Sequence, residues 1–184
     1  MIDNKKSVEG RKSRRMGPGT HVMCKVTDKE IKETPSGKSL LEIWFTNPRG
    51  ESQKKTIWFP DSSPKPRDGE SNEAAKEREI NRFTGEITDI LIAFFSEEEA
   101  VLSASTPLDF AKKAIAKLTS IPSGKFCNIL VQYDIDYKYT EIPKYGWIQP
   151  YVEGQPATLR ITEKTRLTPP TQKPNKSEEA SRYY

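Results

Sequence analysis

The sequence has little that could bind a metal ion, with one histidine and two cysteines among its 184 residues. His21 cannot form a zinc site with Cys24 and Cys127 at any usual ligand spacing. Each cysteine lies in an apolar run, and no secretion signal precedes them, so we interpret both as buried free thiols rather than a disulfide. No acidic motif calls for magnesium, and we expect no cofactor.

Long apolar runs are also missing. Nothing approaches the roughly 18 consecutive apolar residues of a transmembrane helix. The start of the chain, MIDNKKSVEGRKSRR, has no apolar segment of the kind found in secretory signals. We therefore expect a cytoplasmic protein without a membrane partner. Hydrophobic residues make up 34% and charged residues 30%, which predicts a modest core with solvated segments.

Motifs for catalysis are lacking as well. A Ser/His/Asp arrangement would depend on His21, which has no motif around it. The segment Pro35–Lys38 lacks the first glycine of a phosphate-binding loop and the helix that should follow. We interpret Glu97–Glu99 as the start of a capped helix rather than a metal site. The sequence therefore predicts that the protein is not an enzyme.

Charge is distributed unevenly along the chain. Residues 1–16 carry a net charge of +4, residues 70–120 carry −4, and the rest of the chain is positive. Such segregation permits a surface that binds polyanions on a nearly neutral protein. The polar, basic residues 1–16 are predicted to be a flexible arm, and residues 168–184, rich in Pro, Ser, Lys and Glu, a flexible tail.

The order of the expected elements indicates the fold. Strands are predicted at residues 20–33, 40–46 and 52–60, helices within about 70–120, and further strands at 125–135, 147–152 and 157–163. A Ser-x-x-Glu capping box at Ser96 and an N-cap at Thr106 before Pro107 mark two helix starts. The prediction is a mainly β domain (α+β) over residues 17–167, a five-stranded OB-type β-barrel with a helical insertion between strands three and four. A generic α+β sandwich with the same order remains an alternative.

Alternation along the second and third strands places tryptophans away from the core. Leu41, Ile43 and Phe45 form the inner set of residues 40–46, which leaves Trp44 on the outer face. By the same argument Trp58 is on the outer face of the third strand. The OB fold binds oligonucleotides on this face, where rings stack on bases and cations contact phosphates. The open alternative is that the helical insertion covers this face and both tryptophans belong to a second core.

The loops beside this face carry more cations and aromatic rings. In OB domains the loop between strands one and two and the loop between strands four and five flank the binding groove. The complete set of candidate nucleic-acid-binding residues is Trp44, Trp58, Lys54, Lys32, Lys38, Tyr137, Lys138, Tyr139, Lys144 and Tyr145.

Three segments carry a resemblance to a known family. They are GTHVMCKVTDKEIKETPSGKSLLEIWF, KKTIWFP and FCNILVQYDIDYKYTEIPKYGWI. Over roughly residues 18–165 the pattern resembles the OB-fold single-stranded DNA-binding proteins of bacteriophage replication modules. The resemblance implies sequence-tolerant coating of single-stranded DNA during replication or recombination, with Trp44 and Trp58 stacking on bases. It also implies replication proteins as partners, contacted through the C-terminal tail.

Two other functions remain open from the sequence. An OB-type domain can bind another protein, so a structural or adaptor protein is one alternative. Binding of single-stranded RNA is the other, because stacking and phosphate contacts do not distinguish RNA from DNA.

Overall fold

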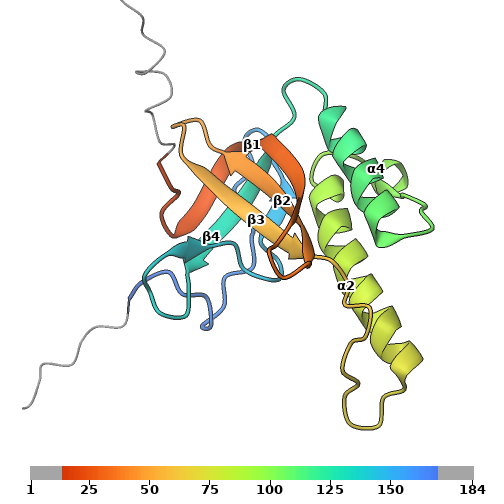
Figure 1. The fold of residues 1–184 in the computed structure, drawn as a ribbon. Coiled ribbons are helices and arrows are strands. Elements are labelled where there is room, and N and C mark those ends of the chain that lie inside the picture. The colour runs from red at the N-terminus through yellow and green to blue at the C-terminus, as the bar shows by residue number, and fades with distance from the viewer. Residues whose placement is uncertain (1–13, 170–184) are drawn as a thin grey trace, which may run out of the picture.

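Three strands at the start of the chain are joined by two tight turns. In the computed structural model, which describes residues 14–169, these are β1 (Gly19–Glu33), β2 (Ser39–Thr46) and β3 (Ser52–Trp58). Gly37 and Gly50 each adopt a φ of +76°, which glycine reaches without the steric cost that other residues meet. The predicted antiparallel meander is confirmed (Figure 1).

β1 is long enough to pair with two strands. Its second half pairs with β2, and its first half pairs with β4 (Cys127–Tyr133). The register shifts between Val26 and Asp28 and again between His21 and Cys24. Such bulges bend a strand and increase its twist, which lets β1 turn from one partner to the other.

The sheet is mainly antiparallel and contains six strands. Its order is β3-β2-β1-β4-β5, where β5 is Thr140–Glu141, and β6 (Ile148–Pro150) also pairs with β4. The predicted α+β class is therefore confirmed. The sheet is not closed into a barrel by a backbone ladder: β3 and β5 are the two ends of the order within residues 14–169.

The C-terminal part differs from the prediction in two places. Residues 157–163, predicted as a strand, form no strand, because the Thr158 amide donates to the side chain of Gln149 instead of a neighbouring strand. β5 lies inside residues 136–145, which were expected to be a loop. The predicted strand at 147–152 is confirmed only as the short β6, at Ile148–Pro150.

The helical segment lies between β3 and β4, as predicted. It consists of α2 (Asn72–Ile92), α3 (Glu97–Ala100) and α4 (Pro107–Thr119). Ser96 and Glu99 form the predicted capping box, and the side chain of Thr106 caps α4 by accepting from the amide of Asp109. No helix among residues 14–169 has the length and apolar character needed to cross a membrane.

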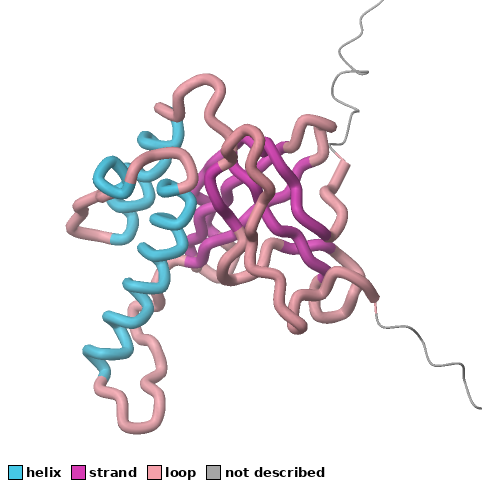
Figure 2. Tube along the Cα trace, turned by 180° about the vertical axis from the view of Figure 1, so that it is seen from behind, coloured by secondary structure: helices cyan, strands magenta, loops and turns pink. Residues whose placement is uncertain are grey.

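One continuous core joins the helices to the sheet. Figure 2 shows the helices gathered at one side of the strands. Phe83 of α2 contacts Phe59, just after β3, and Phe110 of α4, with ring centroids 4.9 and 6.3 Å apart. At the other end of the core the Trp147 ring packs edge-on against Phe45 at 5.6 Å.

Two residues before β1 are also held against the sheet. Met16 is fully buried in the core, and its amide donates to the Ser52 carbonyl of β3. Arg15 forms a bridge with the same residue. Most of the predicted basic arm, and the predicted tail beyond residue 169, lie outside the described residues.

The two thiols should react slowly in the native protein. Cys24 and Cys127 are register partners in β1 and β4, both free and both fully buried. Burial raises the pKa of Cys24 to about 12 and that of Cys127 well above its usual value, so little reactive thiolate forms at neutral pH. Labelling with a maleimide at pH 7.5 should be slow without denaturant and complete in guanidinium. Rapid labelling of both thiols in the native protein would contradict this placement.

Candidate nucleic-acid interface

Three rows of side chains cross the outer face of β1, β2 and β3. Cross-strand pairing aligns Asp28 with Trp44 and Lys54, then Glu30 with Glu42 and Thr56, then Lys32 with Leu40 and Trp58. Successive rows are two residues apart along each strand, or about 7 Å. The two tryptophans therefore lie on one face, two rows apart, as predicted.

The helical segment does not cover this outer face. Trp58 is 46% exposed and Trp44 is half-buried. α2 instead reaches the opposite side of β3, where Glu86 forms an ion pair with the inward-facing Lys55. Near Trp58, α2 contributes Arg82, which donates to the backbone carbonyl of Trp58 and leaves the indole ring exposed.

The cations closest to the tryptophans are held by a carboxylate. Lys32 and Lys54 both form ion pairs with Glu42, and Lys32 also pairs with Glu30 at 2.6 Å. Burial alone would raise the pKa of Glu42, but hydrogen bonds from the two lysines outweigh it and lower that pKa. Glu42 is only 4% exposed although it lies on the outer face. The sequence analysis missed this carboxylate, whose position between two lysines is visible only once the register is known.

Lys38 lies beside Trp58. It belongs to the loop between β1 and β2, one of the two loops that were expected to flank the binding groove. A cavity of about 410 Å³ is lined by both residues together with Arg82 of α2. The cavity therefore extends from the outer face to Arg82, a cation that the sequence analysis did not identify as a candidate.

A second cavity extends the face at Trp44. It has a volume of about 270 Å³ and is lined by Trp44, Lys54 and Arg15 among others. The Arg15 guanidinium lies 5.5 Å from the ring centroid of Tyr139, which is 62% exposed. Tyr139, from the loop between β4 and β5, is thus brought close to Arg15, which lines the cavity beside Trp44.

The remaining loop candidates are divided between two places. Tyr137 is half-buried, with its ring centroid 5.8 Å from that of Tyr133. Lys138 is exposed next to it. Lys144 and Tyr145 line a separate cavity against the C-terminal segment.

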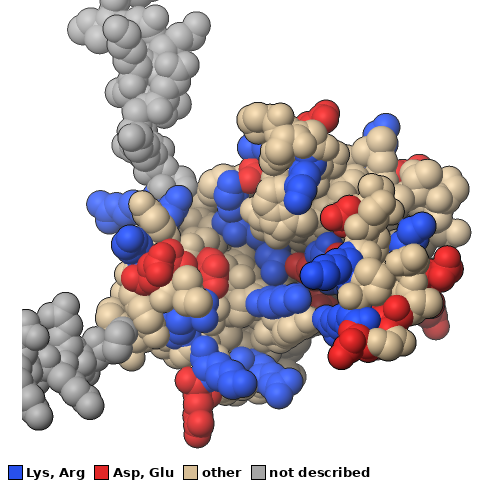
Figure 3. Space-filling view, turned by 60° about the horizontal axis from the view of Figure 1, so that its bottom comes forward, with Lys and Arg blue, Asp and Glu red and all other residues tan. Residues whose placement is uncertain are grey.

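Lys and Arg side chains are not scattered at random over the surface that Figure 3 shows. Figure 3, which brings forward the lower side of the molecule in Figure 1, shows Lys and Arg side chains running through the middle of that surface. Asp and Glu side chains lie mainly toward its two sides. On the surface that faces the viewer, basic groups are therefore concentrated in the middle.

Comparisons with known families and curated proteins give no information on the site. No protein-family model matches the chain, and no curated protein matches it significantly. Within residues 14–169 no group of three or more His, Cys, Asp or Glu side chains is placed to hold a metal ion.

Proposed function

We propose that the protein binds single-stranded DNA, with little sequence preference, on the outer face of β1–β3. The observation that carries this proposal is the pair of outward-facing tryptophans, Trp44 and Trp58, left uncovered by the helices and flanked at both ends by cavities with cations. Stacking of a base on such a ring contributes about 1–3 kcal/mol and tolerates any base. A role in replication or recombination, in phage or host, follows from the resemblance in the sequence.

We also propose that the sheet is an OB-type barrel whose last seam is made by side chains. The side-chain amide of Gln53 in β3 donates to the Thr140 carbonyl of β5 at 3.0 Å. The Thr140 hydroxyl donates to the side-chain oxygen of Gln53 at 3.2 Å. These bonds connect the two ends of the strand order, which is where an OB barrel closes. Under this proposal the outer face corresponds to the surface on which OB domains bind oligonucleotides.

Binding should be specific for single strands. Bases must be unstacked to lie on Trp44 and Trp58, which a duplex prevents. Quenching of tryptophan fluorescence by dT and rU oligomers, and by a blunt duplex of matched length, measures this preference at two salt concentrations. Binding to the duplex as tight as to dT would contradict the proposal, and tighter binding to rU than to dT would assign the site to RNA.

Removing the charge of Glu42 should strengthen binding. Glu42→Gln removes the only ion pair of Lys54 among the described residues, so that ammonium group becomes available to phosphates, while Lys32 keeps its ion pair with Glu30. Because each phosphate contact on a single strand releases roughly 0.7 counterions, the logarithmic salt slope should steepen by about 0.7. Affinity for dT should rise several-fold at low salt.

The exposed Glu97 of α3 supplies a matched control, since Glu97→Gln changes the net charge equally. It should leave the salt slope unchanged. A slope for Glu42→Gln equal to that of Glu97→Gln would show that phosphates do not reach this face.

A further inference from the structure

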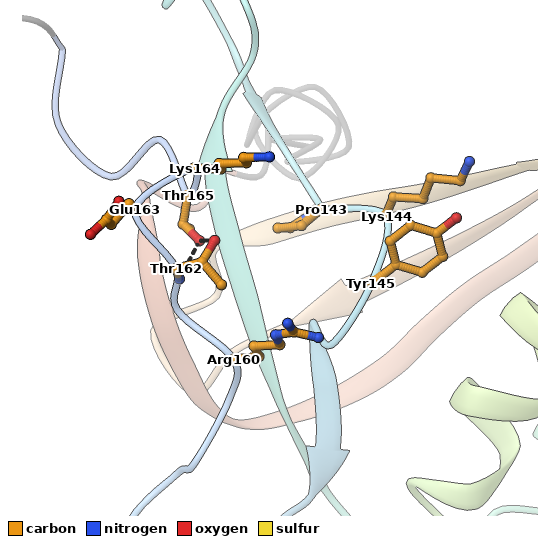
Figure 4. A pocket seen from close by; sticks show the side chains of 8 residues that line it. All are labelled: Pro143, Lys144, Tyr145, Arg160, Thr162, Glu163, Lys164 and Thr165. Atoms are coloured by element: carbon orange, nitrogen blue, oxygen red, sulfur yellow. Dashed lines mark hydrogen bonds between the residues drawn. The ribbon is translucent and has the colours of Figure 1, made fainter.

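A third cavity lies apart from the tryptophan face. It has a volume of about 560 Å³ and is formed between residues 143–145 and residues 160–165. Figure 4 shows Lys144 and Tyr145 on one side and Arg160 on the other, with its guanidinium pointing toward the tyrosine ring. Tyr145 is 68% exposed, and the Lys144 ammonium lies 5.2 Å from its ring centroid.

The cations of this cavity form no ion pairs with other described residues. Among residues 14–169, no ion pair involves Lys144, Arg160 or Lys164, in contrast to Lys32 and Lys54 on the tryptophan face. The only acidic residue in the lining is Glu163, which Figure 4 places on the far side of the group from Tyr145. Three cations against one carboxylate favour an anionic ligand.

The C-terminal segment is fixed in place at both ends of the cavity. The Arg160 amide donates to the Gly146 carbonyl at 3.3 Å, and the Tyr133 amide donates to the Arg166 carbonyl at 2.8 Å. Gly146 has a φ of +63°, and a Cβ added there would be 3.0 Å from that of Arg160. Glycine therefore lets the two segments approach closely, and the backbone hydrogen bond to Gly146 fixes the position of Arg160 at the cavity.

Two hydroxyl groups complete the lining. The Thr162 amide donates to the Thr165 hydroxyl at 2.9 Å, and the two hydroxyl oxygens are 3.4 Å apart. Hydroxyls beside Lys and Arg are common phosphate-contacting groups. The exposed Tyr145 ring adds a surface on which one base can stack.

We infer that this cavity binds the phosphodiester backbone of the same single strand, as a second subsite in which Lys144, Arg160 and Lys164 supply the phosphate contacts. This inference rests on the proposed function. Two contributions to the binding free energy then come from different places. Base stacking occurs on the tryptophan face, where Glu42 pairs with the lysines. The salt-dependent phosphate contacts are made in the cavity. The C-terminal segment, which forms no strand, thereby becomes part of the binding surface.

The test uses the full chain carrying Lys144→Gln, Arg160→Gln and Lys164→Gln together. Three exposed lysines outside the cavity give a control of equal charge: Lys76→Gln, Lys112→Gln and Lys125→Gln. Affinities are measured by anisotropy, over a range of salt, for labelled dT and for a strand of equal length made of abasic phosphodiester units. Because three phosphate contacts are removed, the cavity variant should bind both strands at least tenfold more weakly at low salt, with a slope smaller by about 2. The control variant should keep most of the slope.

The result for Trp44→Ala distinguishes failure of the inference from failure of the proposed function. If both hold, this variant loses affinity for dT only and keeps the salt slope. If the cavity variant behaves like its control while Trp44→Ala weakens dT binding, the inference is wrong and the proposed function stands. If dT binds no more tightly than the abasic strand and Trp44→Ala changes nothing, the stacking proposal is wrong. Absence of binding to either strand at low salt would overturn both.

Discussion

The double variant Trp44→Ala, Trp58→Ala should lose most of its affinity for single-stranded DNA, about 2–6 kcal/mol if the two rings act independently. Each substitution removes one of the two tryptophan rings on which bases are proposed to stack. Thermal stability should change much less, because Trp58 is 46% exposed and leaves no cavity behind. Trp44 is half-buried beneath Lys54, so its removal should account for most of a loss of about 1 kcal/mol. Anisotropy of labelled dT measures binding, and urea unfolding measures stability.

Two controls separate loss of the site from loss of the fold. Trp147 is 1% exposed and packs on Phe45, so Trp147→Ala should cost about 3–5 kcal/mol of stability. Val101→Ala with Leu108→Ala removes exposed apolar side chains from the helical segment and should change neither quantity. If the tryptophan double variant is stable and binds dT with unchanged affinity, the outer face is not the site.

Alternation in the sequence predicted the faces of β2 because its apolar residues repeat strictly. Leu41, Ile43 and Phe45 are all fully buried, and the residues between them lie on the outer face. The same logic could not predict Glu42, because its burial depends on lysines of β1 and β3 that the register brings together. Local patterning thus determined which side each residue takes, while the partners of each side chain depended on non-local pairing.

The C-terminal part shows where sequence patterning has too little information. β5 has two residues, and no periodicity can be recognised over so short a strand. Residues 157–163 alternate like a strand, but they are held by hydrogen bonds from Thr158 to the Gln149 side chain and from the Arg160 amide to the Gly146 carbonyl. Arg160 was therefore expected in a strand and not in a cavity wall.

β3 carries a lysine on its inner face, which the sequence analysis did not consider. Lys55 is buried between Gln53 and Ile57, and it is satisfied by an ion pair to Glu86 at 3.2 Å and a hydrogen bond to the Pro143 carbonyl at 3.1 Å. Its ammonium also lies 5.3 Å from the ring centroid of Trp147. Glu86 comes from α2, so this ion pair fixes the helical segment to the sheet.

Glu86→Gln should therefore destabilise the protein strongly, by about 3 kcal/mol at pH 7, because it leaves the Lys55 charge buried without a counter-ion. Lys55→Met should cost less, since Glu86 keeps its ion pair with Arg82 at 3.1 Å. The double variant Lys55→Met, Glu86→Gln removes both charges and should be more stable than Glu86→Gln alone. Urea unfolding of the four proteins gives the coupling energy, and equal losses for the two single variants would contradict this asymmetry.

The loss caused by Glu86→Gln should shrink as the pH rises. Burial already lowers the pKa of Lys55 in the folded protein, against the opposing effect of Glu86, while the unfolded chain keeps a pKa near 10.5. Between these two values the unfolded state holds one more proton, so the contribution of Lys55 to the free energy of unfolding increases with pH. Without the Glu86 charge the pKa of Lys55 in the folded protein falls further. The pH range in which stability rises with pH therefore begins at a lower pH. The difference in unfolding free energy between Glu86→Gln and the wild type should accordingly be smaller at pH 9.5 than at pH 7, whereas a purely steric effect of the substitution would be the same at both.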